Sequence, residues 1–324
     1  MVSGTVGPRD GGGGRRLLIP ALAALLIGAA PLPAGFTLVP GGFEAGRQPD
    51  GNSVVIYAPA GMIVVDTGRH KAHTDKVLAA ARAAGKPVAA VINTHWHLDH
   101  VSGNPAVKAA FPAARIYASV AIDEALTGFL ARSAADARAA LASGKLDAAM
   151  AEEVRGDLAT IEAGERLKPD VRVTRSGRTR IAGRLLDLRL ASHAATAGDV
   201  WVYDPATRVA IVGDLVTLPA PFLDTACPEG WRKALAEVSA TRFRTLVPGH
   251  GPVLDRAAFD AYRQGFEALI DCAASDAKAE ACATAWGQAA HAVDPANDEV
   301  RAVRMAAYYV TEVLRRPGGT ACPA

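Results

Sequence analysis

The sequence predicts a layered α/β protein in which short buried strands alternate with helices. Apolar, β-branched runs, typical of strands buried on both faces, occur at residues 53–57, 62–65 and 87–92. Between the second and third runs, residues 73–84 have a helical composition and stop at Gly85, with Pro87 beyond. This alternation of strand, helix and strand is the pattern of an α/β fold.

The second half of the chain repeats the strand signal. Residues 199–203 and 208–212 are alternating or apolar runs, and the turn residues 204–207 between them predict a hairpin. Further short strands are expected at residues 115–119 and 245–247, and from Val171 onward.

Two segments lie outside this strand pattern. Residues 122–166 are rich in alanine and charge, which predicts a helical insertion with a break at Ser143-Gly144. Residues 256–324 predict a C-terminal extension with at least two helices, the last from near Asp294-Pro295 to Pro317-Gly318. The insertion fits either a lid over a pocket or plain outer-layer packing.

The N-terminus has the pattern of a signal peptide over residues 1–34. Arg15-Arg16 precede the apolar run 17–30, and Pro31-Leu32-Pro33-Ala34 follow it. The paired arginines also allow a twin-arginine export signal, and an uncleaved membrane anchor stays open. We therefore expect a periplasmic or secreted protein without stable membrane insertion after cleavage.

The charge balance argues against a nucleic-acid partner. The chain of 324 residues has 35 basic and 33 acidic residues, and without residues 1–34 it keeps 32 of each. A neutral protein of this size, half hydrophobic, can bury a large core and is expected to act on a small molecule. The sequence does not indicate an oligomeric state.

The four cysteines all lie in the last hundred residues, at positions 227, 272, 282 and 322. Three pairings are possible, and an oxidising compartment favours Cys272 with Cys282, which are close in sequence. Cys227 would then pair with Cys322 and tie the C-terminus to the loop after Asp214. The alternative is four free buried thiols.

The segment 93–100, Asn-Thr-His-Trp-His-Leu-Asp-His, begins where the strand 87–92 ends. It brings together the side chains of His95, His97, Asp99 and His100. Such a density of polar groups is costly unless a cation is bound. His95 and His97 would project to one side of an extended segment, as chelation requires. Asp66, in the turn after the strand 62–65, could brace this loop. By contrast, His70, His73 and His291 are expected to be ordinary histidines.

Four motifs in order resemble the metallo-β-lactamase-fold hydrolase superfamily, over roughly residues 36–255. The first is His-x-His-x-Asp-His at residues 95–100, and the second is His193 followed closely by Gly198-Asp199. The third and fourth are Gly213-Asp214 and the run Pro-Gly-His-Gly at residues 248–251.

The resemblance implies a four-layer αββα sandwich with two divalent metal ions at one edge. His95, His97 and His193 would hold one ion, and Asp99, His100 and His250 the other. Asp214 would bridge them. Imidazole and carboxylate ligands suit zinc and also admit iron or manganese. On this basis residues 35–255 form the catalytic domain, with residues 256–324 packed on it.

The expected chemistry is hydrolysis by a hydroxide shared between the two metals. Asp99 would be the catalytic group that accepts and relays a proton. Asp214 differs from the cysteine or serine of the β-lactamase branches and makes the ligand set similar to that of glyoxalase II. We therefore rank ester, thioester or lactone bonds above β-lactams. Two alternatives remain, an iron-dependent persulfide dioxygenase and a non-catalytic metal-binding protein of the periplasm.

The apolar, proline-rich loop 215–231 follows Asp214 and is the expected wall of the substrate pocket. It resembles the same stretch in exported superfamily members linked to quinoprotein systems, where an aspartate and a tryptophan follow the Gly-Asp motif. Here these residues are Asp224 and Trp231. Asp224 equally fits a solvated loop charge.

Overall fold

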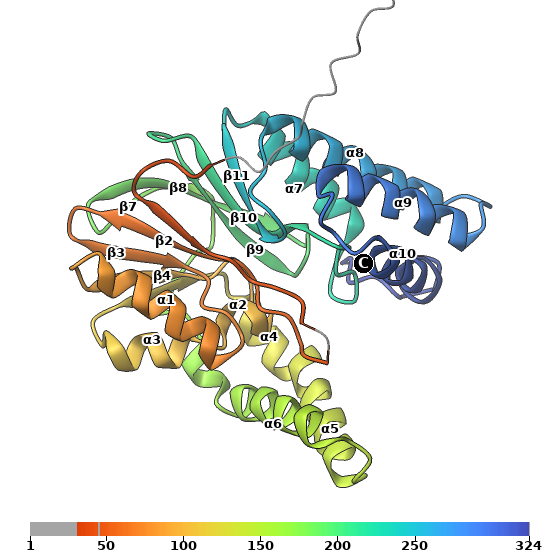
Figure 1. The fold of residues 1–324 in the computed structure, drawn as a ribbon, viewed down its shortest axis with the longest axis horizontal. Helices are drawn as coiled ribbons and strands as arrows, with labels where there is room; N and C mark the ends of the chain where they lie inside the picture. The colour runs from red at the N-terminus through yellow and green to blue at the C-terminus, as the bar shows by residue number, and fades with distance from the viewer. Residues whose placement is uncertain (1–30, 45, 324) are drawn as a thin grey trace, which may run out of the picture.

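The computed structural model describes residues 31–44 and 46–323. Most of the predicted signal peptide, residues 1–30, therefore lies outside the described residues. Two β-sheets face each other, and helices cover the outer side of each (Figure 1). The predicted α/β fold class and the αββα layering are both confirmed.

The first sheet has six strands in the order β1 to β6. They are β1 (Phe36–Val39), β2 (Ser53–Ala58), β3 (Gly61–Val65), β4 (Val88–Ile92), β5 (Arg115–Ala118) and β6 (Val171–Arg172). The first three strands pair antiparallel, and β3 to β6 pair parallel. Because parallel neighbours need a crossover, α1 (Lys71–Ala83) connects β3 to β4.

The second sheet has five strands in the order β11-β10-β9-β8-β7. They are β7 (Gly177–Ile181), β8 (Arg184–Ser192), β9 (Gly198–Asp204), β10 (Val209–Thr217) and β11 (Thr245–His250). Both β10 and β11 run further than the sequence predicted. The parallel ladder between them shifts register at Gly213, opposite Pro248, so β11 accommodates the proline at the edge of the sheet.

Strands of the first sheet contribute side chains to two hydrophobic clusters, one between the sheets and one under the outer helices. Val54 and Ile56 of β2 pack between the two sheets, whereas Val55 packs under the helices of the outer layer. The inner face of the second sheet supplies Leu188 and Val202 to the same central cluster. Strands buried on both faces explain why the sequence shows continuous apolar runs rather than strict alternation.

Different helices cover the two sheets. The first sheet is covered by α1 and α3 (Asn104–Ala110), and the second by α7 (Pro228–Ala240) and α8 (Arg256–Ala273). Behind α8 lie α9 (Ala279–Val293) and α10 (Glu299–Tyr308), which share its hydrophobic cluster (Figure 1). Each sheet is thus packed against a hydrophobic cluster on both of its faces.

The insertion is helical, as predicted. It contains α4 (Ala121–Thr127), α5 (Phe129–Ala142), α6 (Ala148–Glu162) and the 3₁₀ turn η1 (Gly164–Leu167). The break at Ser143-Gly144 is confirmed, and Gly128 adds a second one. In Figure 1, α5 and α6 project from the sandwich as a pair. α6 nevertheless contacts the first sheet's loops, where the Arg69 guanidinium donates to the two oxygens of Asp157 at 2.7 and 2.6 Å.

The last helix starts later than predicted. Asp298, not Asp294, is its N-cap, and the Asp298 carboxylate accepts a hydrogen bond from the Arg301 backbone N–H at 2.9 Å. Asp294 instead caps a short turn after α9. The helix then continues from α10 into one π-helical segment, η2 (Tyr309–Leu314). The domain boundaries proposed from sequence stay predictions.

Both disulfide pairings are confirmed. Cys272 bonds Cys282 across the turn between α8 and α9, and Cys227 bonds Cys322. The second bond ties the C-terminal tail to the residue before α7. The Ala321 N–H also donates to the Ala226 carbonyl at 2.8 Å. Two disulfides indicate an oxidising compartment.

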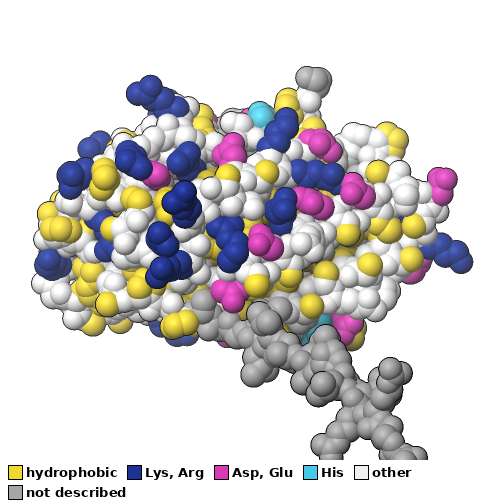
Figure 2. All heavy atoms as spheres, turned by 90° about the horizontal axis from the view of Figure 1, so that it is seen from above, with side chains coloured by type: hydrophobic (Ala, Val, Ile, Leu, Met, Phe, Trp, Pro, Cys, Tyr) yellow, Lys and Arg dark blue, Asp and Glu magenta, His cyan; other side chains and the backbone are white. Residues whose placement is uncertain are grey.

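Charge is unevenly distributed over the surface, although the protein is nearly neutral. Figure 2 shows lysine and arginine side chains gathered toward one part of the visible face. The segment 172–189 alone contains six arginines, and β7 within it is an edge strand. Charged residues on an edge strand discourage pairing with another chain. In residues 31–44 and 46–323, no helix is long and apolar enough to span a membrane.

The two disulfides are expected to differ in their effect on stability. Loop-closure entropy gives about 4.7 kcal/mol for a loop of 95 residues and about 2.7 kcal/mol for one of 10. Replacing Cys227 and Cys322 together by serine should therefore lower the free energy of unfolding by about 2 kcal/mol more than replacing Cys272 and Cys282. Denaturant unfolding of the two double variants measures this, and equal losses would contradict it.

Candidate metal centre

Six of the seven predicted ligands meet at one edge of the sandwich. The loop after β4 and the short helix α2 (Leu98–Val101) carry the first four ligands from the first sheet. Asp214 lies within β10 and His250 is the last residue of β11, so the second sheet supplies the other two. The six buried ligands are His95, His97, Asp99, His100, Asp214 and His250.

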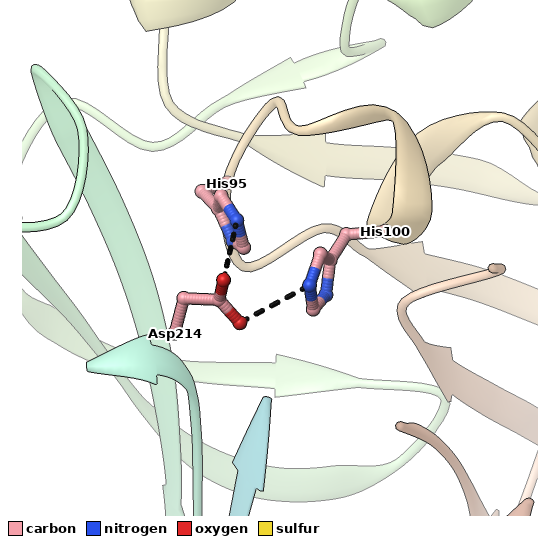
Figure 3. A group of neighbouring side chains, drawn as sticks. All are labelled: His95, His100 and Asp214. Carbon is pink, nitrogen blue, oxygen red and sulfur yellow. Dashed lines mark ion pairs between the residues drawn. The ribbon is translucent and has the colours of Figure 1, made fainter. Parts of the chain in front are cut away.

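Asp214 lies between two sets of histidines. Its Oδ2 is 3.6 Å from Nε2 of His95 and 4.0 Å from Nδ1 of His97. Its Oδ1 is 3.1 Å from Nε2 of His100 and 3.7 Å from Nε2 of His250. Figure 3 shows the carboxylate pointing one oxygen toward His95 and the other toward His100. One oxygen for each set is an arrangement in which a carboxylate can bridge two cations.

Asp99 completes the second set. Its Oδ2 is 3.0 Å from Nε2 of His250 and 3.8 Å from Nε2 of His100. The potential ligand atoms of Asp99, His100 and His250 all lie within 4.8 Å of one another, as do those of His95, His100 and Asp214. The geometry is therefore that of two adjoining cation sites.

His193 is the exception. It follows β8 with a φ of 52° and is half-buried. Like His97, it belongs to neither of these two ligand groups, and, unlike His97, its ring lies within 4.0 Å of no carboxylate oxygen among the described residues. Its loop is nonetheless well ordered internally, because the buried Asp199 carboxylate accepts hydrogen bonds from the Thr196 N–H and hydroxyl. The assignment of His193 as a ligand stays a prediction.

Hydrogen bonds determine which nitrogen of His95 and His100 is free. The Thr94 hydroxyl donates to Oδ2 of Asp66 at 2.7 Å, so it accepts from Nδ1–H of His95 at 2.9 Å. The same Asp66 oxygen accepts from Nδ1–H of His100 at 2.8 Å. In each ring Nε2 is therefore the nitrogen that faces Asp214 and can bind a cation, and the predicted bracing role of Asp66 is met by this geometry.

Thr225 has the same role for His97, and the sequence did not indicate it. Its hydroxyl donates to the Ala195 carbonyl at 2.9 Å and therefore accepts from Nε2–H of His97, also at 2.9 Å. Nδ1 of His97 is then the free nitrogen, and it is the one that faces Asp214. Thr225 is 128 residues from His97, so no local motif reveals the contact.

Two motif glycines make room for these groups. A Cβ on Gly249 would lie 1.9 Å from Oδ1 of Asp214, inside its van der Waals radius. Gly213 has a φ of +53°, and a Cβ there would lie 2.5 Å from the Thr94 side chain. The close approach of β11 to β10 at Asp214 therefore requires glycine at both positions.

The buried carboxylates around His100 favour positive charge at the centre. Burial lowers the pKa of His100, but the surrounding Asp214, Asp99 and Asp66 carboxylates outweigh it and hold that pKa well above its usual range. Burial raises the pKa of Asp214, yet His100, His250 and His95 together bring it well below its usual range. Burial and the neighbouring His100 and His97 rings lower the pKa of His95.

The free ligand atoms fit metal ions. Among the described residues, Nε2 of His95, Nε2 of His100 and Oδ1 of Asp214 are buried without a hydrogen-bond partner. Buried polar atoms without partners are costly, and these converge on one place. Neutral imidazole nitrogens and carboxylates are the ligand types of zinc, iron and manganese.

The loop after β10 forms only part of the expected pocket wall. Phe222 packs against His97, with ring centroids 5.0 Å apart. Trp231, by contrast, is fully buried in α7 and donates its indole N–H to the Leu215 carbonyl at 2.9 Å, so it belongs to the core and does not line a pocket. Asp224 is half-buried and accepts a hydrogen bond from the exposed Tyr308 hydroxyl at 3.3 Å.

Thr225→Val should weaken metal binding. Valine keeps the shape but removes the acceptor that holds His97 in its ligating tautomer, and loss of such a contact typically costs about 10–100-fold in metal affinity. Thr225→Ser should retain most of the affinity. Competition titration with a chromophoric chelator measures this, with Thr160→Val on α6 as a control. Equal affinity of the valine variant and the unmodified protein would contradict the assignment.

Comparisons with known proteins agree with this site. The family model of the metallo-beta-lactamase superfamily matches residues 46–250. A linear primary-alkylsulfatase of Pseudomonas sp. (strain ATCC 19151) is 31% identical over 230 residues, which cover 62% of this chain and 42% of that protein. The chain therefore spans less than half of this curated relative.

Solved structures show the same fold. A metallo-beta-lactamase from Pontibacter korlensis superposes with a TM-score of 0.51 at 20% identity, covering 74% of this chain and 99% of that one. The sec-alkylsulfatase Pisa1 from Pseudomonas sp. gives 0.50 at 19% identity, covering 69% of this chain and 40% of that one. With the family model covering both the motif at residues 95–100 and His250, the chain belongs to the metallo-β-lactamase superfamily.

Proposed function

We propose that this protein is an exported hydrolase that uses two divalent metal ions, zinc in the first instance, to cleave an ester, thioester or lactone bond of a small molecule. The observation that carries the proposal is the position of Asp214. Its two oxygens face His95 and His97 on one side and His100 and His250 on the other. A pair of cations held in this way suits hydrolysis better than simple metal storage.

In this proposal one group of residues holds the metal ions and Asp99 also accepts a proton. When bound, two divalent cations supply Lewis acidity that brings the pKa of a coordinated water to about 7. One ion would be held by His95, His97 and His193. The other ion would be held by Asp99, His100 and His250, and Asp214 would bind both ions. No side-chain nucleophile is required, and all four cysteines are in disulfides.

Asp99 is the proposed proton acceptor. Burial raises the pKa of its carboxyl, but His100 and His250 outweigh burial, and Arg69 at 3.9 Å adds to the downward shift. The carboxylate therefore stays ionised at neutral pH. An ionised oxygen beside the centre can accept a hydrogen bond from the attacking water and direct the proton toward the leaving group.

The bond class follows from the ligand set rather than from the family name. An aspartate at position 214 resembles the thioesterase, lactonase, phosphodiesterase and sulfatase branches of the superfamily. β-Lactam cleavage is accordingly ranked lower. The predicted signal peptide and the two disulfides support a periplasmic or secreted location.

A sulfate ester is the second candidate substrate. The linear primary-alkylsulfatase that is 31% identical over 230 residues supports it. The match covers 42% of that protein, so any transfer of its activity to this chain needs a direct test. Hydrolysis of a sulfate ester by water gives an alcohol and sulfate, and the same residues would hold the ions that promote it.

Asp214→Ala should reduce the metal content below one ion per chain and lower turnover by more than about 100-fold, because both sites lose a ligand. Metal analysis of the protein purified without chelators gives the first value. Asp136→Ala, an exposed carboxylate on α5, is the matched control. Two ions per chain in the Asp214 variant would show that Asp214 does not bridge.

A substrate panel on the fully loaded protein separates the candidates. We expect hydrolysis of carboxylic esters, thioesters or lactones to exceed that of a β-lactam and of an alkyl sulfate. A faster alkyl sulfate would establish the second candidate instead. Oxygen uptake with a persulfide, on iron-loaded protein, would indicate the dioxygenase alternative. No turnover of any substrate at full metal loading would leave a metal-binding protein and refute the proposal.

A further inference from the structure

Two phenylalanines border the metal centre on opposite sides. Phe43, in the segment between β1 and β2, packs on the His250 ring with centroids 5.2 Å apart. Phe222, in the loop after β10, packs on the His97 ring at 5.0 Å. His250 and His97 belong to different ligand sets, so each set has one aromatic ring at its rim. Phe43 is 36% exposed, which leaves apolar surface beside the centre.

Helix α10 connects these two sides. The Arg301 guanidinium lies over the Phe43 ring, 5.4 Å from its centroid. At the other end of the helix the Tyr308 hydroxyl donates to Asp224, and the adjoining Tyr309 ring is 6.2 Å from Phe222. Positions seven apart share a helix face and lie about 10 Å apart along the axis. The helix therefore runs along the rim, from the His250 side to the His97 side.

The two ends of this face differ in charge. Arg301 faces only a distant and exposed partner, since its Nε is 3.7 Å from an Asp298 carboxylate whose side chain is 59% exposed. Such solvent-exposed ion pairs are weak. Among the described residues the Arg301 guanidinium donates no closer hydrogen bond. At the opposite end Asp224 is bound by Tyr308, and burial raises the pKa of that carboxyl. The Arg301 guanidinium is thus an available cation on the His250 side, beside Phe43.

We propose that α10 is the substrate-recognition helix of this hydrolase, and that the substrate combines an apolar group with an anionic group. The apolar group contacts Phe43 and Phe222, and the anionic group binds Arg301. The inference rests on the proposed function for the position of the reacting bond and adds the class of molecule that carries it. Arginine suits this role because its planar guanidinium binds carboxylate, phosphate or sulfate oxygens through two hydrogen bonds.

Binding of a non-hydrolysable ligand tests the proposal without turnover. Octane-1-sulfonate and octan-1-ol share the apolar chain and differ in charge, and calorimetry on the metal-loaded full chain gives both dissociation constants. We expect the sulfonate to bind about 10-fold more tightly, as one charge-assisted contact provides. Arg301→Gln should remove the difference in affinity between the sulfonate and the alcohol. Phe43→Ala should weaken the binding of both ligands equally.

The controls separate recognition from folding. Arg242→Gln replaces an exposed arginine before the opposite end of β11 and should leave both constants unchanged. An unchanged melting temperature in Arg301→Gln excludes a loss of fold as the cause. The proposal is overturned if Arg301→Gln keeps the preference for sulfonate, or if the unmodified protein binds neither ligand at millimolar concentration.

The outcomes also distinguish this inference from the proposed function. Hydrolysis of esters with no effect of Arg301 on sulfonate binding would retain the hydrolase and reject α10 as its recognition helix. Sulfonate binding that depends on Arg301, without hydrolysis of any substrate, would support α10 as a recognition helix and reject the proposed hydrolase activity. If both hold, Arg301→Gln should raise KM for an anionic half-ester about 10-fold, with little change for the matching neutral ester.

Discussion

The structure depends on compensating three buried carboxylates around one imidazole. Asp66, Asp99 and Asp214 all act on His100, and none of these side chains is more than slightly exposed. Burying charge of one sign is costly unless opposite charge lies beside it. Asp66 follows β3, Asp99 lies in α2 and Asp214 lies in β10, so these charges come together only when the two sheets pack face to face. The grouping of the candidate ligands and the packing of the sheets therefore share one geometry.

The segments outside the two sheets support that edge from different directions. The insertion reaches it through Asp157, which orients Arg69 toward Asp99. On the other side, the C-terminal tail is bonded to Cys227, two residues after the threonine that holds His97. The final helix places Arg301 over Phe43, and Tyr309 after it lies beside Phe222. Additions to the common fold thus act on the same few ligands that the fold itself brings together.

Sequence reasoning succeeded where a residue's role depends on its neighbours in the chain. The strand before the ligand run, the break at Ser143-Gly144 and the Cys272–Cys282 pair were predicted from local patterns, and the Cys227–Cys322 pair followed as the remaining one. It failed where contacts between residues far apart in the chain determine the role of a residue. Trp231 seemed a pocket residue because it follows Asp214 in a proline-rich loop, but α7 turns its ring into the core. The last helix was placed too early because Asp294-Pro295 is also a good helix start.

By itself, the sequence determined the types of ligand, their order and the fold that carries them. Spacings such as His-x-His and Pro-Gly-His-Gly follow from strand and turn geometry, which acts over a few residues. Only the tertiary structure decided that Thr225 selects the nitrogen of His97, that Asp214 gives one oxygen to each side, and that α10 borders the centre. Those contacts join segments far apart in the chain, and packing of the whole core brings them into register.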